Sequence, residues 1–393
     1  MWFAYFLNYC DRQAVTSMFP VLRVELGFTD KQLGLIASIF LWVYGAGSVI
    51  AGQIGDRISK RQLVVWSLVV WSVVTVATGF STSVFMVLAL RAGMGISESL
   101  YMPAAIALTA NAHAPERRSR AIAALTTAQV AGIVGGGWFG GWMAHHGHWR
   151  EAFLLLGAAG VLFAVPYHLF LRGVSEEAAA ETRKTDSKLA LAALAKVPTY
   201  RLLCVVFPAF VFGLWVIYTW FANFLHEKFS LNLADAGFNA TAFLQGATLV
   251  GLLSGGVLAD RLYLRTKAAR CWLLTASLLL CAPCLHALGN SDTLAATRIA
   301  AAGFGLFAGL FMGNIFPASF EVVPANTRAS AVGVLNLFGA IVSGFGAYLG
   351  GKWKTTIGIE GLMSLTALLY LAAAILLIAG IKLLFKRDYE RIH

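Results

Sequence analysis

The sequence predicts an all-α integral membrane protein with twelve transmembrane helices arranged in two six-helix halves. Three observations support this fold class: the composition, a series of long apolar segments and an internal repeat. Hydrophobic residues make up 59% of the chain and charged residues 12%, and the mean hydropathy is +0.73. Globular domains carry about 25% charged residues, so this composition indicates that most of the chain lies in lipid.

The apolar segments are separated by charged and turn-rich sequence. Each is close to the length of about 20 residues that a helix needs to cross the hydrocarbon layer of a bilayer. The segments lack the alternating pattern of a β-barrel strand, and a helix satisfies its own backbone hydrogen bonds in lipid. We therefore expect spans at residues 1–22, 32–54, 63–81, 84–111, 121–144, 152–171, 202–226, 237–259, 271–289, 294–322, 329–351 and 358–385.

The two halves repeat each other in sequence. Gly52-x-x-x-Asp56-Arg57 after the second span recurs as Gly256-x-x-x-Asp260-Arg261 after the eighth. At the same offset, His148-Trp149-Arg150 before the sixth span corresponds to Lys352-Trp353-Lys354 before the twelfth. Matches in the same order at one offset indicate duplicated halves with the same orientation.

A long stretch of mixed charge separates the halves. We expect an N-terminal six-helix bundle at 1–172, a cytoplasmic linker at 173–201 and a C-terminal bundle with a cytoplasmic tail at 202–393. Within the linker, residues 189–195 have the pattern of a short interfacial helix.

Lysine and arginine set the expected orientation. Most of them lie in the loops on the side of the two termini, and cytoplasmic loops carry the excess of these residues. We therefore expect a multi-pass protein of the plasma (inner) membrane with both termini in the cytoplasm. A short leader is expected before Met1, and we expect a monomer in contact with membrane lipid. The net charge of +11 follows from the loop pattern and predicts no nucleic-acid partner.

Four charged residues lie well inside the spans, whereas Arg298 lies near the outer end of the tenth. Asp11 and Arg12 are near the middle of the first span, and Arg91 and Glu98 are in the fourth. A charge at this depth costs about 2.5–3.5 kcal/mol and usually faces a cavity or a partner. Arg91 and Glu98 are close to two helical turns apart, so they share a helix face. A simpler alternative is that Asp11 and Arg12 only neutralise each other and hold two helices together.

These residues suggest how an anion could be coupled to a proton. A guanidinium stabilises the ionised form of a nearby acid. An anion that binds the arginine removes this effect and favours protonation of the acid. Asp11 and Glu98 are the acids that lie well inside spans, so they are the candidates for carrying the proton.

Several other functions are not predicted. The sequence has no G-x-x-x-x-G-K-[ST] phosphate loop and no extramembrane segment of a size to bind ATP. The spans contain no nucleophile paired with a base, so we expect no enzyme activity and no cofactor. The five cysteines lack metal-ligand spacing, so we expect no metal site. If the chain carries a solute across the membrane, an ion or substrate gradient must then drive it.

The loop motif at residues 52–61, Gly-x-x-x-Asp-Arg followed by a basic pair, resembles the signature of the major facilitator superfamily. This resemblance, with twelve spans and a central loop, covers the whole chain and implies transport by alternating access around a central cavity. In such carriers the loop acid binds a neighbouring helix in one conformation and releases it in the other. The implied conformational lock comprises Gly52, Asp56, Arg57, Asp260 and Arg261.

Two further patterns, Asn-Tyr-x-Asp-Arg at 8–12 and Arg-x-x-x-Gly-x-x-Glu at 91–98, resemble the anion:cation symporter branch. That branch includes sugar-acid:proton symporters for galactonate and hexuronates and the sialin-like carriers. The resemblance implies that Asp11 and Glu98 couple protons, that Arg12 binds the substrate carboxylate and that Arg91 modulates Glu98. The implied substrate-binding residues besides Arg12 are Tyr9, Tyr44, Gln129, Trp220 and Asn336.

The predicted function is therefore a proton-coupled symporter of a small organic anion such as a sugar acid. A second resemblance, to spinster-type carriers, rests on Asp-Arg-Gln at 11–13, on Gly-Asp-Arg-x-Ser-Lys-Arg at 55–61 and on Trp71-Ser72. It implies transport of a lysolipid or another amphiphile. The polar residues Tyr44, Gln129 and Asn336 favour a hydroxylated substrate. A third alternative, from another class, is a membrane receptor without transport activity.

Overall fold

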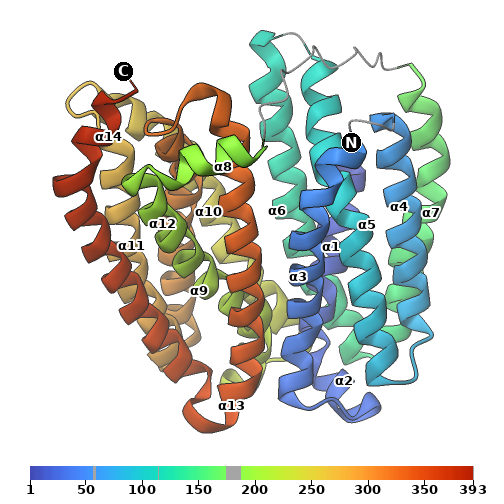
Figure 1. Cartoon of the computed structure of the whole chain (residues 1–393). Helices are drawn as coiled ribbons and strands as arrows, with labels where there is room; N and C mark the ends of the chain where they lie inside the picture. Colours follow the sequence, from blue (N-terminus) through green and yellow to red (C-terminus); the bar gives the residue numbers. More distant parts are fainter. Residues whose placement is uncertain (56–58, 114, 174–186, 393) are drawn as a thin grey trace. The chain divides into compact units, whose positions relative to one another are not determined.

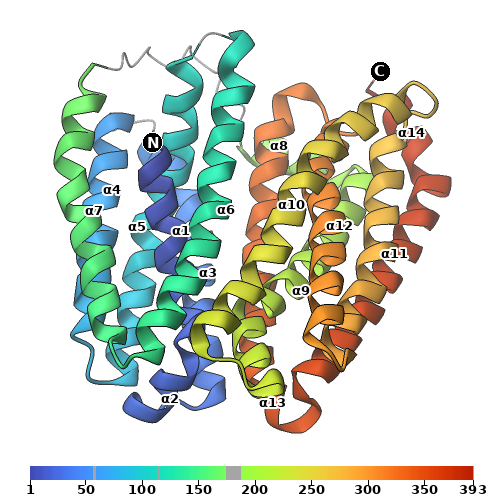
Figure 2. The same ribbon diagram turned by 180° about the vertical axis from the view of Figure 1, so that it is seen from behind.

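The computed structural model describes residues 1–55, 59–113, 115–173 and 187–392. In these residues the elements are helices and no β-strand occurs, which agrees with the predicted fold class. Figures 1 and 2 show the chain from opposite sides. The predicted lock residues Asp56 and Arg57 lie outside the described residues.

The first part of the chain forms seven helices within the described residues. They are α1 (Trp2–Ser17), α2 (Phe19–Leu26), α3 (Asp30–Gly55), α4 (Lys60–Gly79), α5 (Val84–Asn111), α6 (Pro115–His145) and α7 (Trp149–Leu171). The predicted first span is thus divided at Met18, because Pro20 has no amide hydrogen for the helical ladder. The axes of α2 and α3 differ by 118°, and Gly27, with φ of 69°, ends α2.

The rest of the chain begins with a short helix at the position where an interfacial helix was predicted, and it continues with the second set of long helices. The elements are α8 (Ser187–Ala195), α9 (Pro198–Phe229), α10 (Leu233–Tyr263), α11 (Ala269–Asn290), α12 (Leu294–Phe320), η1 (Ala325–Thr327), α13 (Arg328–Gly380), η2 (Ile381–Phe385) and α14 (Lys386–Glu390). The last two predicted spans are continuous in α13, with a kink at Gly358, where φ is 70° and ψ is 169°.

Within the described residues, eight helices are long and apolar enough to cross a membrane, or nine if the bent pair α2 and α3 forms one span. Two further predicted spans, in α1 and α6, are not long or apolar enough by the same criterion. α1 has only 16 residues and carries polar and charged residues such as Asn8, Asp11 and Arg12. α6 carries six glycines between residues 132 and 141, which lower its mean hydropathy.

The chain divides into two compact units. Unit 1 comprises residues 1–180, 217–242 and 347–352, and unit 2 comprises residues 181–216, 243–346 and 353–393. Parts of α9, α10 and α13 group with the first unit, and the expected halves at 1–172 and 202–393 stay a prediction.

Glycine brings the helices of unit 1 into backbone contact. α1 and α6 run side by side (Figures 1 and 2), and a Cβ added at Gly132, Gly136 or Gly140 would meet the backbone of α1. On another face of α6, a Cβ at Gly141 would collide with Leu233. Small residues allow this close packing of helices in lipid.

Aromatic side chains and a carboxylate organise unit 2. The rings of Phe210 and Phe311 stack with centroids 4.0 Å apart, and the Tyr370 hydroxyl donates to the carbonyl of Phe210 at 2.6 Å. At the start of α9, Asp388 accepts hydrogen bonds of 2.8 Å from both the backbone amide and the hydroxyl of Thr199. A carboxylate from α14 thus satisfies a free amide at the N-terminus of α9.

Replacing Gly140 by alanine should destabilise unit 1. The added Cβ would overlap the backbone of Ala14, and overpacking of this kind costs about 1–3 kcal/mol. We expect a lower midpoint of thermal unfolding in detergent. Gly246→Ala is the matched control, because a Cβ there meets no described atom within 4 Å. Equal losses in the two variants would contradict the assigned packing role of Gly140.

Candidate functional site

Unit 1 contains a buried charged cluster where α1 meets α5. The Arg12 Nε of α1 donates to the Glu98 Oε2 of α5 at 2.5 Å. Glu98 is fully buried, Asp11 and Arg91 are 1% and 3% exposed, and the Arg12 side chain keeps 14% of its surface accessible. The structure therefore brings together the four charged residues singled out from the sequence, and it leaves Arg12 as the most accessible of them.

Aromatic rings surround the Arg12 guanidinium. Its Cζ lies 5.0 Å from the ring centroid of Tyr9, 4.7 Å from that of Phe40 and 5.1 Å from that of Tyr44. Tyr9 and Tyr44 were expected here, whereas Phe40 was missed. The available signal was its spacing, because residues 40 and 44 are one helical turn apart on α3 and share a face. Ring faces attract a cation and exclude water.

A glycine of α5 allows α3 to bring these rings close. A Cβ at Gly95 would lie 2.9 Å from the carbonyl oxygen of Phe40 and 3.2 Å from the amide of Tyr44. Gly95 therefore allows α5, which carries Glu98, to pack closely against α3, which carries Phe40 and Tyr44.

Asp11 has different neighbours from Arg12. Its Oδ2 accepts from the Thr75 hydroxyl of α4 at 3.2 Å, and the Arg91 Nη1 lies 3.5 Å from the Asp11 carbonyl oxygen. Consecutive residues of an α-helix do not face each other. The alternative in which Asp11 and Arg12 neutralise each other is therefore wrong in this structure, because the ion-pair partner of Arg12 is Glu98.

Several polar atoms of the cluster have no hydrogen-bond partner among the described residues. They are Asp11 Oδ1, Arg12 Nη2, Arg91 Nε and Nη2, and Glu98 Oε1. Buried polar groups in folded proteins are normally paired with protein or ordered water. These donors and acceptors therefore provide positions for water or for a polar ligand, and Arg12 Nη2 is a donor suited to an anion.

The remaining predicted ligands lie in other surroundings. Gln129 is partly exposed on α6, and Asn336 is exposed on α13 in unit 2. Trp220 is fully buried. Its indole donates to the Ala347 carbonyl at 2.9 Å, and its ring packs edge-on against Phe19. The substrate-binding roles of these three residues stay predictions.

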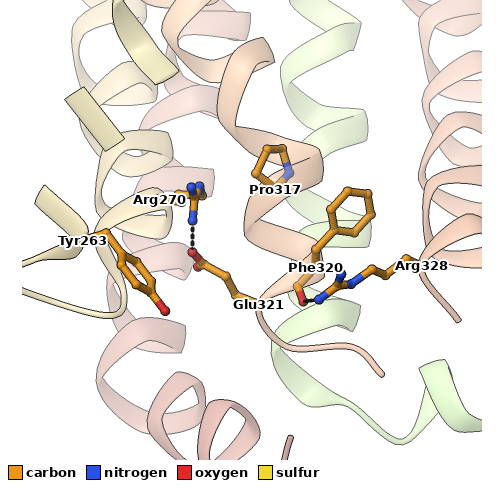
Figure 3. A pocket seen from close by; sticks show the side chains of 6 residues that line it. All are labelled: Tyr263, Arg270, Pro317, Phe320, Glu321 and Arg328. Carbon is orange, nitrogen blue, oxygen red and sulfur yellow. Dashed lines mark hydrogen bonds and ion pairs between the residues drawn. The ribbon is translucent and has the colours of Figure 1, made fainter. Parts of the chain in front are cut away.

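In unit 2, the predicted lock residue Asp260 belongs to a charged network. The other members of this network were not predicted from the sequence. Arg270 pairs with Asp260 at 2.9 Å and also with Glu321, as Figure 3 shows for the second pair. Arg270 links the end of α10, the start of α11 and the residue after α12. Of the other lock residues, Arg261 lies next to Asp260 on α10 and Gly52 lies in α3.

A pocket of about 260 Å³ lies beside this network. It is lined by Tyr263, Arg270, Pro317, Phe320, Glu321 and Arg328 (Figure 3). The Arg328 guanidinium donates to the carbonyl of Phe320 at 3.5 Å. In the described residues no group of three or more His, Cys, Asp or Glu side chains could hold a metal ion.

Comparison with known proteins identifies one matching protein family. The sequence profile of the Major Facilitator Superfamily matches residues 1–347. A probable sulfoacetate transporter of Cupriavidus necator is 32% identical over 68% of this chain and 65% of its own length. An MFS-type efflux pump of Mycolicibacterium smegmatis is 28% identical over 95% of this chain and 88% of the pump. A probable galactarate/D-glucarate transporter of Bacillus subtilis is 26% identical over 86% of this chain and 80% of that protein.

A solved structure shares the fold. It is the crystal structure of a bacterial homologue of the human lysosomal transporter Spinster in an inward-facing and occupied conformation. The TM-score is 0.84 and the sequence identity is 20%, with 98% of this chain and 96% of that chain covered. At this identity the likeness supports the fold and carries no argument about the substrate.

Proposed function

Because the chain belongs to the Major Facilitator Superfamily, we propose that it is a secondary active transporter that moves a small organic anion together with protons by alternating access. Relatives named as transporters of sulfoacetate and of galactarate or glucarate support an organic anion as the substrate. The bacterial relatives also support location in a plasma membrane. The cytoplasmic position of both termini and the monomeric state stay predictions.

The observation that carries the proposal is the ion pair between Arg12 and Glu98. A guanidinium is a planar donor that suits a carboxylate, and it binds other oxyanions in the same way. Arg12 already holds one carboxylate, that of Glu98, and its Nη2 is unpaired within the described part of the chain. A substrate anion can therefore use this donor first and then compete with Glu98 for the guanidinium.

Competition for Arg12 supplies the coupling. When the anion takes the guanidinium, Glu98 loses the cation that stabilises its ionised form in a fully buried position. A buried acid without a cation favours its neutral state. Substrate binding therefore favours protonation of Glu98, and release of the substrate lets Glu98 pair with Arg12 again and give up the proton. Asp11 is the second proposed proton carrier. Arg91, which lies close to the Asp11 backbone, is the proposed modulator of Glu98.

The surroundings of Arg12 favour a small substrate with an apolar side. The rings of Tyr9, Phe40 and Tyr44 surround the guanidinium. Aromatic faces pack against the C–H side of a sugar acid, and the hydroxyls of Tyr9 and Tyr44 can form hydrogen bonds with its polar groups. The two alternatives, a lysolipid carrier and a receptor without transport activity, predict different results in a transport assay.

Uptake into proteoliposomes tests the proposal. With an acidic exterior and a neutral interior, we expect labelled glucarate or sulfoacetate to accumulate inside above the external concentration, and a protonophore should remove this accumulation. Empty liposomes are the control. Transport of a labelled lysophospholipid that neither anion inhibits would overturn the proposal in favour of the amphiphile carrier, and binding of either anion without uptake would support the receptor.

A further inference from the structure

The Thr75 hydroxyl of α4 contacts two acceptors at once. Its Oγ1 lies 2.9 Å from the carbonyl oxygen of Trp71 and 3.2 Å from Oδ2 of Asp11, and the residue is fully buried. A hydroxyl has one hydrogen to donate and lone pairs that accept. Thr75 can therefore donate to Trp71 or to Asp11, but not to both at the same time.

The two protonation states of Asp11 require opposite roles of this hydroxyl. When Asp11 is ionised, both carboxylate oxygens only accept, so Thr75 must turn its hydrogen toward Oδ2. When Asp11 is protonated, its own O–H can donate to Oγ1 of Thr75, and the Thr75 hydrogen then stays on the Trp71 carbonyl. The Trp71 carbonyl tolerates both states, because it also accepts a backbone amide within α4.

The charged groups near Asp11 do not replace this contact. Arg91 and Glu98 of α5 face the same region, but within the described residues neither the Arg91 side chain nor any other cation forms an ion pair with the Asp11 carboxylate. On the other sides, α6 presents glycine to α1 at Gly136, and from α7 the ring of Phe153 lies against Arg91. On α1 itself the titratable neighbours are Tyr9, Cys10 and Arg12, and Arg12 is paired with Glu98.

We propose that Thr75 is a positioning residue that stabilises Asp11 in both protonation states by rotating its hydroxyl hydrogen between Trp71 and Asp11. This inference rests on the proposed role of Asp11 as a proton carrier. In each transport cycle the proton leaves Asp11 for the interior, the Thr75 hydrogen moves from the Trp71 carbonyl to the carboxylate, and no covalent bond other than the O–H bond of Asp11 is broken.

The test is the pH profile of Thr75→Val, which keeps the shape of the side chain and removes the hydroxyl. A hydrogen bond to an ionised acceptor is stronger than one to a neutral group, so the variant loses more stabilisation when Asp11 is ionised. Proton release should then require a more alkaline interior. We expect the internal pH for half-maximal net uptake to rise by about 1 unit, and Thr75→Ser should restore the wild-type profile.

Two controls separate the possible outcomes. Thr78 lies about one turn further along α4, is also buried, and its hydroxyl donates to the Val74 carbonyl at 2.9 Å. Thr78→Val should therefore keep the wild-type profile. A wild-type profile in Thr75→Val, or an equal shift in Thr78→Val, would overturn the inference. Accumulation that persists in Asp11→Asn would instead overturn the coupling role of Asp11 itself, so the two failures are distinguishable.

Discussion

Replacing Glu98 by glutamine should abolish proton-driven accumulation while exchange of substrate across the membrane continues. Glutamine has nearly the same shape as glutamate, and its amide oxygen can still accept a hydrogen bond from Arg12, which Glu98 binds at 2.5 Å. It carries no titratable proton, so the variant is fixed in a form that resembles protonated Glu98. Substrate can then bind Arg12 without competition from a carboxylate, so its binding is no longer linked to a proton on residue 98. Asp11 cannot replace this link, because Arg12 pairs with Glu98 and not with Asp11.

The measurement pairs two assays on the same proteoliposomes. Net uptake under an inward proton gradient should stop when internal and external concentrations are equal, and counterflow of labelled against unlabelled substrate should stay near the wild-type rate. Glu151→Gln is the matched control, because it makes the same change at a side chain that is 54% exposed at the start of α7. If Glu98→Gln still concentrates substrate as the wild type does, Glu98 does not couple the proton.

The sequence predicted which charged residues form the buried cluster of unit 1, but not how they pair. An ionisable residue within a span is costly in lipid, and this cost alone singled out Asp11, Arg12, Arg91 and Glu98. Which residues pair depends on how neighbouring helices are rotated and spaced when they pack. The spacing of residues along a single helix does not give this information. The choice of Glu98 as the partner of Arg12 therefore needed the structure.

Neutral residues of the site were harder to find for the same reason. Phe40 and Thr75 are ordinary residues of apolar spans, and only contacts with other helices give them a role. In unit 2, Asp260 was found through the sequence repeat, whereas Glu321 has no repeat signal and is identified by its ion pair with Arg270.

The helices themselves were largely predictable, because long apolar segments have few alternatives in lipid. The exceptions have local causes that were visible in the sequence. Pro20 interrupts the first predicted span, and Gly358 takes up the positive φ at the turn between the last two.

Replacing Arg12 by glutamine should both destabilise the protein and remove binding of the anion. The first effect follows because Glu98 is fully buried and would lose its ion-pair partner. Breaking one side of a buried ion pair costs about 3–5 kcal/mol. The midpoint of thermal unfolding should therefore fall well below that of Arg265→Gln, a control at an exposed arginine after α10.

The second effect is isolated by the double variant Arg12→Gln/Glu98→Gln. With both charges removed, two amides of suitable shape can bond to each other, so the thermal midpoint should recover most of the loss. Anion binding should not recover, because the guanidinium is gone. We expect the affinity for glucarate or sulfoacetate, measured by ligand-dependent thermal shifts, to be about 10- to 100-fold lower than in the wild type. A double variant that binds the anion like the wild type would show that Arg12 only neutralises Glu98. Arg12 pairs with Glu98 in the structure and is proposed to bind the anion in place of Glu98. The single and double variants therefore separate the effect of Arg12 on stability from its proposed effect on binding.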